Sequence, residues 1–281
     1  MASVISRLHS QITRPRIYAL ALLLCLIPVF VPLRLPMEIS FTTKDLLQTL
    51  NALPRGSIMA YGSQISTLPS RRLYNTQAFF DYLCKRGIRL IVYNFLPPAP
   101  LSFEIRFREF VRAEEKYNYK YGVDWVVFPF LGGDEAAVAT VAANMRYFDK
   151  DYYGNPTDSL PLMKSIYTLK DVDICSWEVS EISFIAAMVR QWPAAYGVRA
   201  VNAGAYTYVA PYYGKYVFGT IDGSRGGTEF EYATGYNGEA LMAADMRNML
   251  VIAVIALLIL GNVGEYAKDL EKRRIQRGVV Q

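Results

Sequence analysis

The residues available for chemistry in this chain are carboxylates and tyrosines, because histidine is nearly absent. The single histidine is His9. The sequence that follows it therefore cannot supply a Ser-His-Asp triad, a Cys-His dyad or a histidine-ligated zinc. Cys84 and Cys175 are too few for a cysteine-only metal site, and two separate buried thiols are favoured over a disulfide between them. We accordingly expect no metal, no cofactor and no catalytic residue, and we favour a non-enzymatic function.

Carboxylates are the remaining groups that could act as a general acid and base. Glycoside hydrolysis, for example, needs two of them on either side of a sugar bond. Six lie near the ends of predicted strands or in loops: Asp124, Asp158, Asp171, Asp173, Glu178 and Glu181. Their spacing selects no pair, so a carboxylate-dependent envelope hydrolase is the third of three hypotheses. The acidic segment 149–158 also lacks the spacing of a calcium-binding EF-hand.

Two glycine-rich turns are predicted at strand ends, where open α/β sheets bind ligands. In the first turn, Asp134 and Glu135 suit a helix N-terminus but would repel a phosphate. In the second, Thr228 and Glu231 have the spacing of a capping box, while Arg225 could hold an anion. The second hypothesis is therefore a domain that binds or senses a small anion or sugar. Its candidate ligand-binding residues are Gly132, Gly133, Gly223, Arg225, Gly226, Gly227 and Thr228.

Tyrosine is the outlier in the composition, with 21 residues. Its side chain offers a large flat surface with a polar tip, and it is enriched at protein interfaces. We expect the densest group to form such an interface with another protein. That group consists of Tyr206, Tyr208, Tyr212, Tyr213 and Tyr216.

Short apolar runs alternate with amphipathic helical patterns through the middle of the chain. Runs typical of strands cover 57–61, 89–95, 125–130, 173–177, 198–202 and 216–221, and helical patterns cover 43–53, 71–86, 102–117, 134–148, 181–192 and 228–233. Strands without polar alternation are buried on both faces, as in a parallel sheet covered by helices. The segment 149–170 interrupts this rhythm and is expected to be a long loop. The sequence thus predicts a doubly wound, mostly parallel α/β domain of Rossmann-like architecture.

Two longer apolar runs, at 17–33 and 249–263, lie on either side of this domain. With its flanks, each is long enough to cross a bilayer as a helix. The first run ends without a small-x-small cleavage site, which favours a retained anchor over a signal peptide. The predicted organisation is a tail at 1–16, a transmembrane helix at 17–35, the α/β domain at 36–247, a transmembrane helix at 248–264 and a tail at 265–281.

The distribution of charge predicts how the chain is oriented. The two tails hold eight basic residues and three acids, which accounts for the whole net charge of +5. Basic flanks tend to stay in the cytoplasm, so both tails are expected there and the α/β domain outside. The balanced domain gives no reason to expect nucleic-acid binding, and anionic lipids are the expected counter-charge of the tails. The lack of an Asn-x-Ser/Thr sequon favours a prokaryotic cell membrane.

These features together favour a membrane-anchored, extracytoplasmic assembly domain in the cell envelope. It would bind copies of itself, or another membrane protein, through its tyrosine-rich surface. Ligand binding and envelope hydrolysis are the two alternatives.

Overall fold

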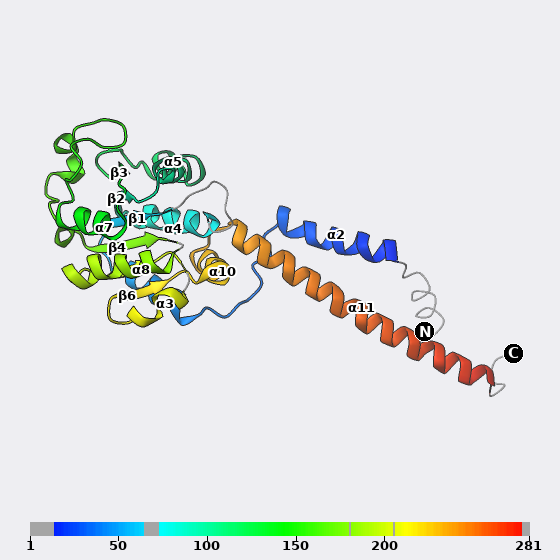
Figure 1. The fold of residues 1–281 in the computed structure, drawn as a ribbon. Helices are drawn as coiled ribbons and strands as arrows, with labels where there is room; N and C mark the ends of the chain where they lie inside the picture. The colour runs from blue at the N-terminus through cyan, green and yellow to red at the C-terminus, as the bar shows by residue number, and fades with distance from the viewer. Residues whose placement is uncertain (1–13, 65–72, 180, 205, 277–281) are drawn as a thin grey trace. The chain divides into compact units, whose positions relative to one another are not determined.

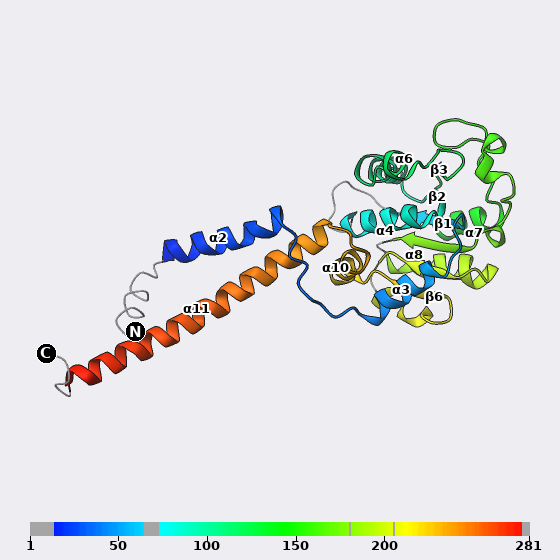
Figure 2. The ribbon, with the colours of Figure 1, turned by 180° about the vertical axis from the view of Figure 1, so that it is seen from behind.

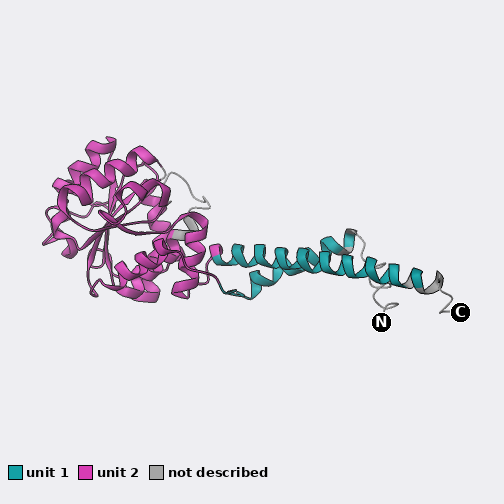
Figure 3. Cartoon of the chain, turned by 90° about the horizontal axis from the view of Figure 1, so that it is seen from below, with its two compact units in different colours: residues 1–36, 241–281 teal, residues 37–240 magenta. Residues whose placement is uncertain are grey.

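The computed structural model describes residues 14–64, 73–179, 181–204 and 206–276. The chain divides into two compact units, one of residues 1–36 with 241–281 and one of residues 37–240 (Figure 3). The first unit contains both predicted membrane helices, and the second corresponds to the predicted α/β domain. The expectations for His9 and for the outer parts of both basic tails lie outside the described residues.

The α/β unit is built on a six-stranded sheet in which every paired neighbour is parallel. Its strands are β1 (Ile58–Ser63), β2 (Arg89–Asn94), β3 (Trp125–Phe130), β4 (Ile174–Glu178), β5 (Ala200–Asn202) and β6 (Val217–Thr220). Their spatial order is β3-β2-β1-β4-β5-β6, so the direction in which strands are added reverses between β1 and β4. This is the Rossmann order, and it confirms the predicted parallel α/β fold.

Helices cover both faces of the sheet, as the apolar strands require (Figures 1 and 2). One layer contains α3 (Phe41–Asn51), α4 (Leu73–Arg86), α5 (Ala99–Ile105), α6 (Ala113–Tyr117) and α10 (Gly223–Thr234). The other contains α7 (Asp134–Ala143), α8 (Ile182–Val189) and α9 (Tyr206–Val209). Alternate strand residues enter opposite cores: Met59 and Tyr61 pack under the first layer, and Ile58 and Ala60 under the second.

Two of the predicted helices are interrupted by π turns. The helix expected at 102–117 is instead α5, a π turn η1 (Arg106–Phe110) and α6. The buried residues of η1 are Arg106 and Phe107. The helix expected at 181–192 becomes α8 followed by a π turn η5 (Arg190–Ala194), which contains a proline. Apolar periodicity alone could not reveal η1, because its buried Arg106 is a charged residue on the core side.

Both edge strands of the sheet are covered by other parts of the chain. The segment 149–170 contains only short 3₁₀ turns and runs along β3, where the backbone N–H of Tyr152 donates to the carbonyl of Val127 (3.0 Å). At the opposite edge, α3 packs on β6, and the Thr49 hydroxyl donates to the carbonyl of Phe218 (2.7 Å). Covered edges protect a sheet from pairing with another chain.

Gly219 is the residue that lets α3 lie directly against β6. A Cβ at this position would stand 2.3 Å from the Cα of Leu46, and the φ angle of 147° is one that residues with a side chain rarely adopt. In the sequence this glycine opens the second predicted glycine-rich turn, which covers 219–228. In the structure, its missing side chain makes room for a helix backbone.

The other unit pairs two apolar helices, α2 (Arg14–Phe30) and α11 (Glu239–Gln276). The buried Asp245 of α11 accepts hydrogen bonds from the backbone N–H groups of Leu33 and Arg34 (2.9 and 3.1 Å), which fastens the end of α2 to α11. Within the described residues, one stretch, Glu239–Leu270, is long and apolar enough to cross a membrane, and only 11% of its apolar window is buried. α2 is shorter than the predicted 17–35 span, since it ends before Pro32.

Gly219→Ala is expected to destabilise the protein by about 3 kcal/mol or more, because the new Cβ collides with the α3 backbone and the φ angle is strained. Urea unfolding of the detergent-solubilised protein, followed by tryptophan fluorescence, measures the change. Gly154→Ala is the matched control, since its φ is also positive (85°) but no atom lies within 4 Å of the added Cβ. We expect this control to lose only about 1 kcal/mol. Equal losses in the two variants would contradict the steric explanation.

Candidate functional site

Polar side chains end three neighbouring strands at the place where the strand order reverses. Ser63 ends β1, and the register pairs it with Asn94 of β2 and with Glu178 of β4. Paired residues of parallel strands point to the same face, and neighbouring strands lie about 4.8 Å apart. The three side chains therefore form a row about 10 Å wide, called the carboxyl-edge row below. Open α/β sheets bind their ligands at this position.

Arg106 faces this row from the helical layer. Its side chain is fully buried, and Nη1 donates to Oε2 of Glu178 (2.7 Å). The same nitrogen donates to Oγ1 of Thr76 (2.8 Å), and Nε donates to the carbonyl of Ser102 (3.1 Å). Tyr61 of β1 donates its hydroxyl to the same oxygen of Glu178 (3.0 Å). The buried ion pair thus joins β1, β4, α4 and η1.

The Arg106–Glu178 pair carries no net charge. Glu178 is stabilised in its ionised form by Arg106 and by the hydroxyl of Tyr61. Burial raises the pKa of Glu178 above its ordinary value, whereas the Arg106 guanidinium and the Tyr61 hydrogen bond oppose that rise. Burial and the adjacent carboxylate both raise the pKa of Tyr61, so the phenol keeps its proton and can donate it. A ligand at this edge would therefore meet a dipole rather than a net charge.

Several buried polar atoms around the row have no hydrogen-bond partner in the described part of the chain. The orientation of Asn94 is determined, because its Nδ2 donates to the carbonyl of Phe128 (2.7 Å) and a flipped amide would place two oxygens together. An unsatisfied buried polar group costs about 1–3 kcal/mol, so such a cluster is suited to bind a ligand or ordered water. The unpartnered atoms include Ser63 Oγ, Asn94 Oδ1, Ser102 Oγ, Ser176 Oγ and Arg106 Nη2.

The unpartnered groups at this edge are amide oxygens, which accept, hydroxyls, which both donate and accept, and one guanidinium nitrogen, which donates, and this mixture indicates the chemistry of a ligand. Besides Asn94, the buried amide oxygens of Gln64, after β1, and Asn202, at the end of β5, lack a described partner. Asn202 also has an amide oxygen left over, since its Nδ2 donates to Oγ1 of Thr220 (3.2 Å), but its register partner is Trp177, so it lies on the other face of the sheet from the row. A neutral molecule with hydroxyl groups supplies donors for the amide oxygens and acceptors for Arg106 Nη2, whereas a phosphate dianion supplies acceptors alone.

Sequence reasoning identified only part of this arrangement. Glu178 is one of the six candidate carboxylates, whereas Arg106, Ser63 and Asn94 are not among the residues singled out from the sequence. The available signal for the two row members is a polar residue close to the end of an apolar run: Ser63 two residues after 57–61, and Asn94 one residue before the end of 89–95. Nothing local to Arg106 indicates that it turns inward, because its partner lies 72 residues further along the chain.

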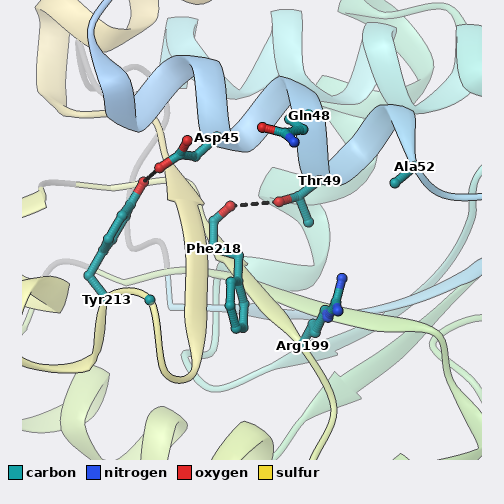
Figure 4. Close-up of a pocket in the computed structure, with 8 residues that line it drawn as sticks. Asp45, Gln48, Thr49, Ala52, Arg199, Tyr213 and Phe218 are labelled. Carbon is teal, nitrogen blue, oxygen red and sulfur yellow. Dashed lines mark hydrogen bonds between the residues drawn. The ribbon is translucent and has the colours of Figure 1, made fainter.

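A separate pocket of about 420 Å³ lies between α3 and the amino ends of β5 and β6 (Figure 4). Its position is at the other end of the strands from the carboxyl-edge row, so the two features are distinct. The pocket is lined by Asp45, Gln48, Thr49, Ala52, Arg199, Tyr213, Gly214 and Phe218.

The second predicted glycine turn is part of a helix. α10 begins at Gly223, five residues before the predicted start. Thr228 therefore lies inside the helix, and its hydroxyl donates to the carbonyl of Ser224 (3.0 Å) instead of capping the N-terminus. The predicted capping box of Thr228 and Glu231 is wrong for this reason. Three of the proposed ligand-binding residues are buried in the helix: Gly226, Gly227 and Thr228.

Arg225, the predicted anion-binding residue, contacts a carboxylate of its own helix. Its Nε donates to Glu229 (2.8 Å), and 74% of its side chain is exposed. Glu229 is fully buried and also accepts hydrogen bonds from the backbone of Ser40 (2.9 Å) and the hydroxyl of Thr43 (2.9 Å). Burial alone would raise the pKa of Glu229. The hydrogen bonds from Ser40, Arg225 and Thr43 together have the larger, opposite effect, so the pKa of Glu229 lies below its ordinary value. Anion binding by Arg225 stays a prediction.

The first predicted turn, at Gly132 and Gly133, joins β3 to α7 and is exposed. Glu135 in the opening turn of α7 accepts hydrogen bonds from Arg190 (2.6 Å) and Gln191 (2.8 Å). The hydrogen bonds from Arg190 and Gln191 lower the pKa of Glu135 to about 2. Carboxylates thus occupy this helix N-terminus, and ligand binding there also stays a prediction.

The tyrosines predicted to form an interface are half-buried in the structure. Tyr206 and Tyr213 contact each other and Phe41 edge to face, with ring centroids 5.2–5.8 Å apart. Much of their aromatic surface is therefore used within the unit, and partner binding through them stays a prediction. The others, which pack against the core beside Tyr213, are Tyr208, Tyr212 and Tyr216.

The other candidate carboxylates mostly have structural partners. Asp158 pairs with Arg146 (2.9 Å), and Asp151 of the acidic segment accepts from the hydroxyl of Tyr121 (2.7 Å). Within the described residues, no group of three or more His, Cys, Asp or Glu could hold a metal ion. Cys84 and Cys175 are buried and unpaired. Carboxylates that accept backbone N–H groups are Asp124, Asp171 and Asp173.

Comparison with known proteins gives no relative of this chain. No protein-family model matches it, and neither a curated protein nor a solved structure matches it. Since one fold can serve many functions, the function has to be argued from the site itself.

Arg106→Met is expected to destabilise the protein by about 3–5 kcal/mol, because it leaves Glu178 as an uncompensated buried carboxylate. The folded-state pKa of Glu178 then lies further above its ordinary value of 4.5. Stability is therefore present at acid pH and is lost as the pH rises through the folded-state pKa. Urea unfolding as a function of pH measures both effects.

The double variant Arg106→Met/Glu178→Gln is the control for this prediction. It removes the buried charge, so it should recover most of the lost stability and should show little pH dependence in the same range. A double variant that is as unstable and as pH-dependent as the single one would contradict the proposed role of the ion pair.

Proposed function

We propose that this chain is a membrane-anchored domain that binds a small, neutral, hydroxyl-bearing molecule, of the sugar or polyol class, at the carboxyl edge of its sheet. The observation that carries the proposal is the carboxyl-edge row of Ser63, Asn94 and Glu178 at the β1/β4 reversal. The unpartnered donors and acceptors at the row match ligand hydroxyl groups, which both donate and accept, and the neutral pair of Glu178 with Arg106 gives no attraction for a net charge. Binding is favoured over hydrolysis because Arg106 and Tyr61 hold Glu178 in one orientation.

The proposed anchor is a helical hairpin of α2 and α11. α11 provides the longer span, and α2, with 17 residues, reaches about 25 Å, which is close to the thickness of a hydrocarbon core. The hydrogen bonds from Leu33 and Arg34 to Asp245 support a paired arrangement of the two helices. With the basic tails in the cytoplasm, the α/β domain would face the outside of a prokaryotic cell membrane.

Ser63→Ala tests the proposed ligand site with two independent measurements. Removing a buried hydroxyl that has no described partner should leave the melting temperature of the unliganded protein unchanged or slightly raised. The same change should weaken ligand binding at least about tenfold, which corresponds to one lost hydrogen bond in a buried site. Neutral monosaccharides and polyols, with inorganic phosphate as the charged comparison, are the probes in a thermal-shift screen followed by calorimetry.

Ser159→Ala is the matched control for this test, because its hydroxyl is exposed and bonds only to the nearby carbonyl of Pro156. It should not change the affinity for any probe. The proposal fails if no sugar or polyol stabilises the protein. It also fails if phosphate binds while the neutral probes do not, or if Ser63→Ala binds as well as the original chain.

A second candidate function is assembly, and exposed tyrosines on the segment that covers β3 favour it. Arg146 stacks on the ring of Tyr167 (4.4 Å), and Arg108 stacks on that of Tyr153 (5.3 Å). Tyrosine and arginine are the residues most often found at the centres of protein interfaces. The partner would be a second copy of the chain or another membrane protein. The exposed tyrosines of this surface are Tyr147, Tyr152, Tyr153 and Tyr167, with 37–57% of each exposed.

Cross-linking in intact membranes tests this second function. Wild-type protein should give a cross-linked oligomer or hetero-complex, and Tyr153→Ala/Tyr167→Ala should reduce its yield severalfold. Tyr206→Ala/Tyr212→Ala is the comparison, because it alters the interface predicted from sequence instead. If the wild-type chain gives only monomers, assembly is excluded. If the yield of cross-linked species falls only in Tyr206→Ala/Tyr212→Ala, the interface lies at the Tyr206–Tyr216 group instead.

A further inference from the structure

The pocket between α3 and β6 has walls that are fixed by short contacts. α3 lies against Gly219, where no side chain separates the helix from the strand. The Thr49 hydroxyl donates to the carbonyl of Phe218 (2.7 Å), and the Tyr213 hydroxyl donates to Asp45 (2.9 Å). The volume of about 420 Å³ is within the range of small-molecule sites. The pocket is therefore preformed and large enough for a small ligand.

Groups of opposite charge lie at opposite ends of this pocket. Figure 4 shows Asp45 with Tyr213 toward one end and Arg199 toward the other. The part of α3 and its C-cap that lines the pocket runs from Asp45 to Ala52, which are seven residues and about 10 Å apart along the helix. The amide of Gln48 and the ring of Phe218 lie between them.

Both charged groups have hydrogen-bonding capacity left for a ligand. Tyr213 binds Oδ2 of Asp45, and no described donor is bonded to Oδ1. Within the described residues, the guanidinium of Arg199 has no hydrogen bond or ion pair, and it lies over the ring of Phe218, 5.5 Å from its centroid. This stacking holds the guanidinium plane in place and leaves its N–H groups available.

Each end of the pocket therefore matches one charge of a zwitterion. A guanidinium binds a carboxylate through two parallel hydrogen bonds, and a free carboxylate oxygen accepts from an ammonium group. A phosphate dianion is disfavoured by the carboxylate of Asp45. We propose that this pocket binds a small zwitterion, with its carboxylate on Arg199, its ammonium group on Asp45 and a chain of several carbon atoms between them. This site is independent of the carboxyl-edge row.

Calorimetric titration of the whole detergent-solubilised chain with ω-amino acids of increasing length tests the proposal. The probes are glycine, 4-aminobutyrate and 6-aminohexanoate, and we expect the longest to bind most tightly because it spans the pocket. Hexanoate and hexylamine, which each lack one charge, should bind at least about tenfold more weakly than 6-aminohexanoate. The proposal is overturned if none of the probes binds, or if hexanoate binds as tightly as 6-aminohexanoate.

Variants identify the site of binding. Arg199→Gln and Asp45→Asn should each weaken 6-aminohexanoate binding about tenfold or more, and Asp45→Asn keeps an acceptor for Tyr213. Lys215→Gln is the matched control, since it removes a positive charge next to Gly214 without changing the lining. An equal loss in Lys215→Gln and Arg199→Gln would mean general attraction by charge and would overturn the proposal. Ser63→Ala should bind this probe normally, which separates this site from the carboxyl-edge row.

Discussion

Burial of a parallel sheet on both faces is the constraint on which this structure depends. It requires apolar strands, two helical layers and covered edges, because a strand edge or face left open would expose unpaired backbone or apolar surface. The chain meets these requirements with two cores, with α3 over β6 and with the segment 149–170 over β3. Within such a sheet, polar side chains can be placed at low cost only where the strands end. We therefore expect the polar residues that bind a ligand to lie at the strand ends.

The Arg106–Glu178 pair is an exception to an apolar interior. Two buried charges are tolerated because they neutralise each other and because Thr76, Ser102 and Tyr61 satisfy further hydrogen bonds. The pair fixes the end of β4 against η1 at the reversal of the strand order. Such a pair suits recognition of a neutral ligand, because its hydrogen-bonding groups are held in fixed directions and it carries no net charge.

The covered edge at β6 has a second consequence. Gly219 brings the backbone of α3 onto the strand, and the side chains that project from the lower side of α3 then enclose a pocket with Tyr213 and Arg199. The same contact that protects the edge thus creates a preformed hollow at the amino ends of β5 and β6. The apolar helices α2 and α11 form a unit of their own, in which Asp245 satisfies the backbone N–H groups that follow α2.

The sequence by itself determined which segments are buried. Its apolar runs predicted the positions of all six strands to within three residues at either end, and their lack of alternation predicted a parallel sheet between helices. These features can be predicted locally, because a strand that is buried on both faces has a continuous apolar run in its own sequence. The site was only partly predictable: Glu178 could be singled out as a carboxylate near a strand end, but its partner could not.

Only the tertiary structure decided which residues meet. Ser63, Asn94 and Glu178 form a row because of the strand register, and Arg106, at the start of the π turn η1, pairs with Glu178 from another part of the chain. The predicted glycine turn at 223–228 became the start of α10. Tyr206 and Tyr213 are half-buried against Phe41 of α3, and the other tyrosines of that group pack against the core. The physical reason is the same in each case: a contact between segments far apart in the chain depends on strand order and packing, which no single segment encodes.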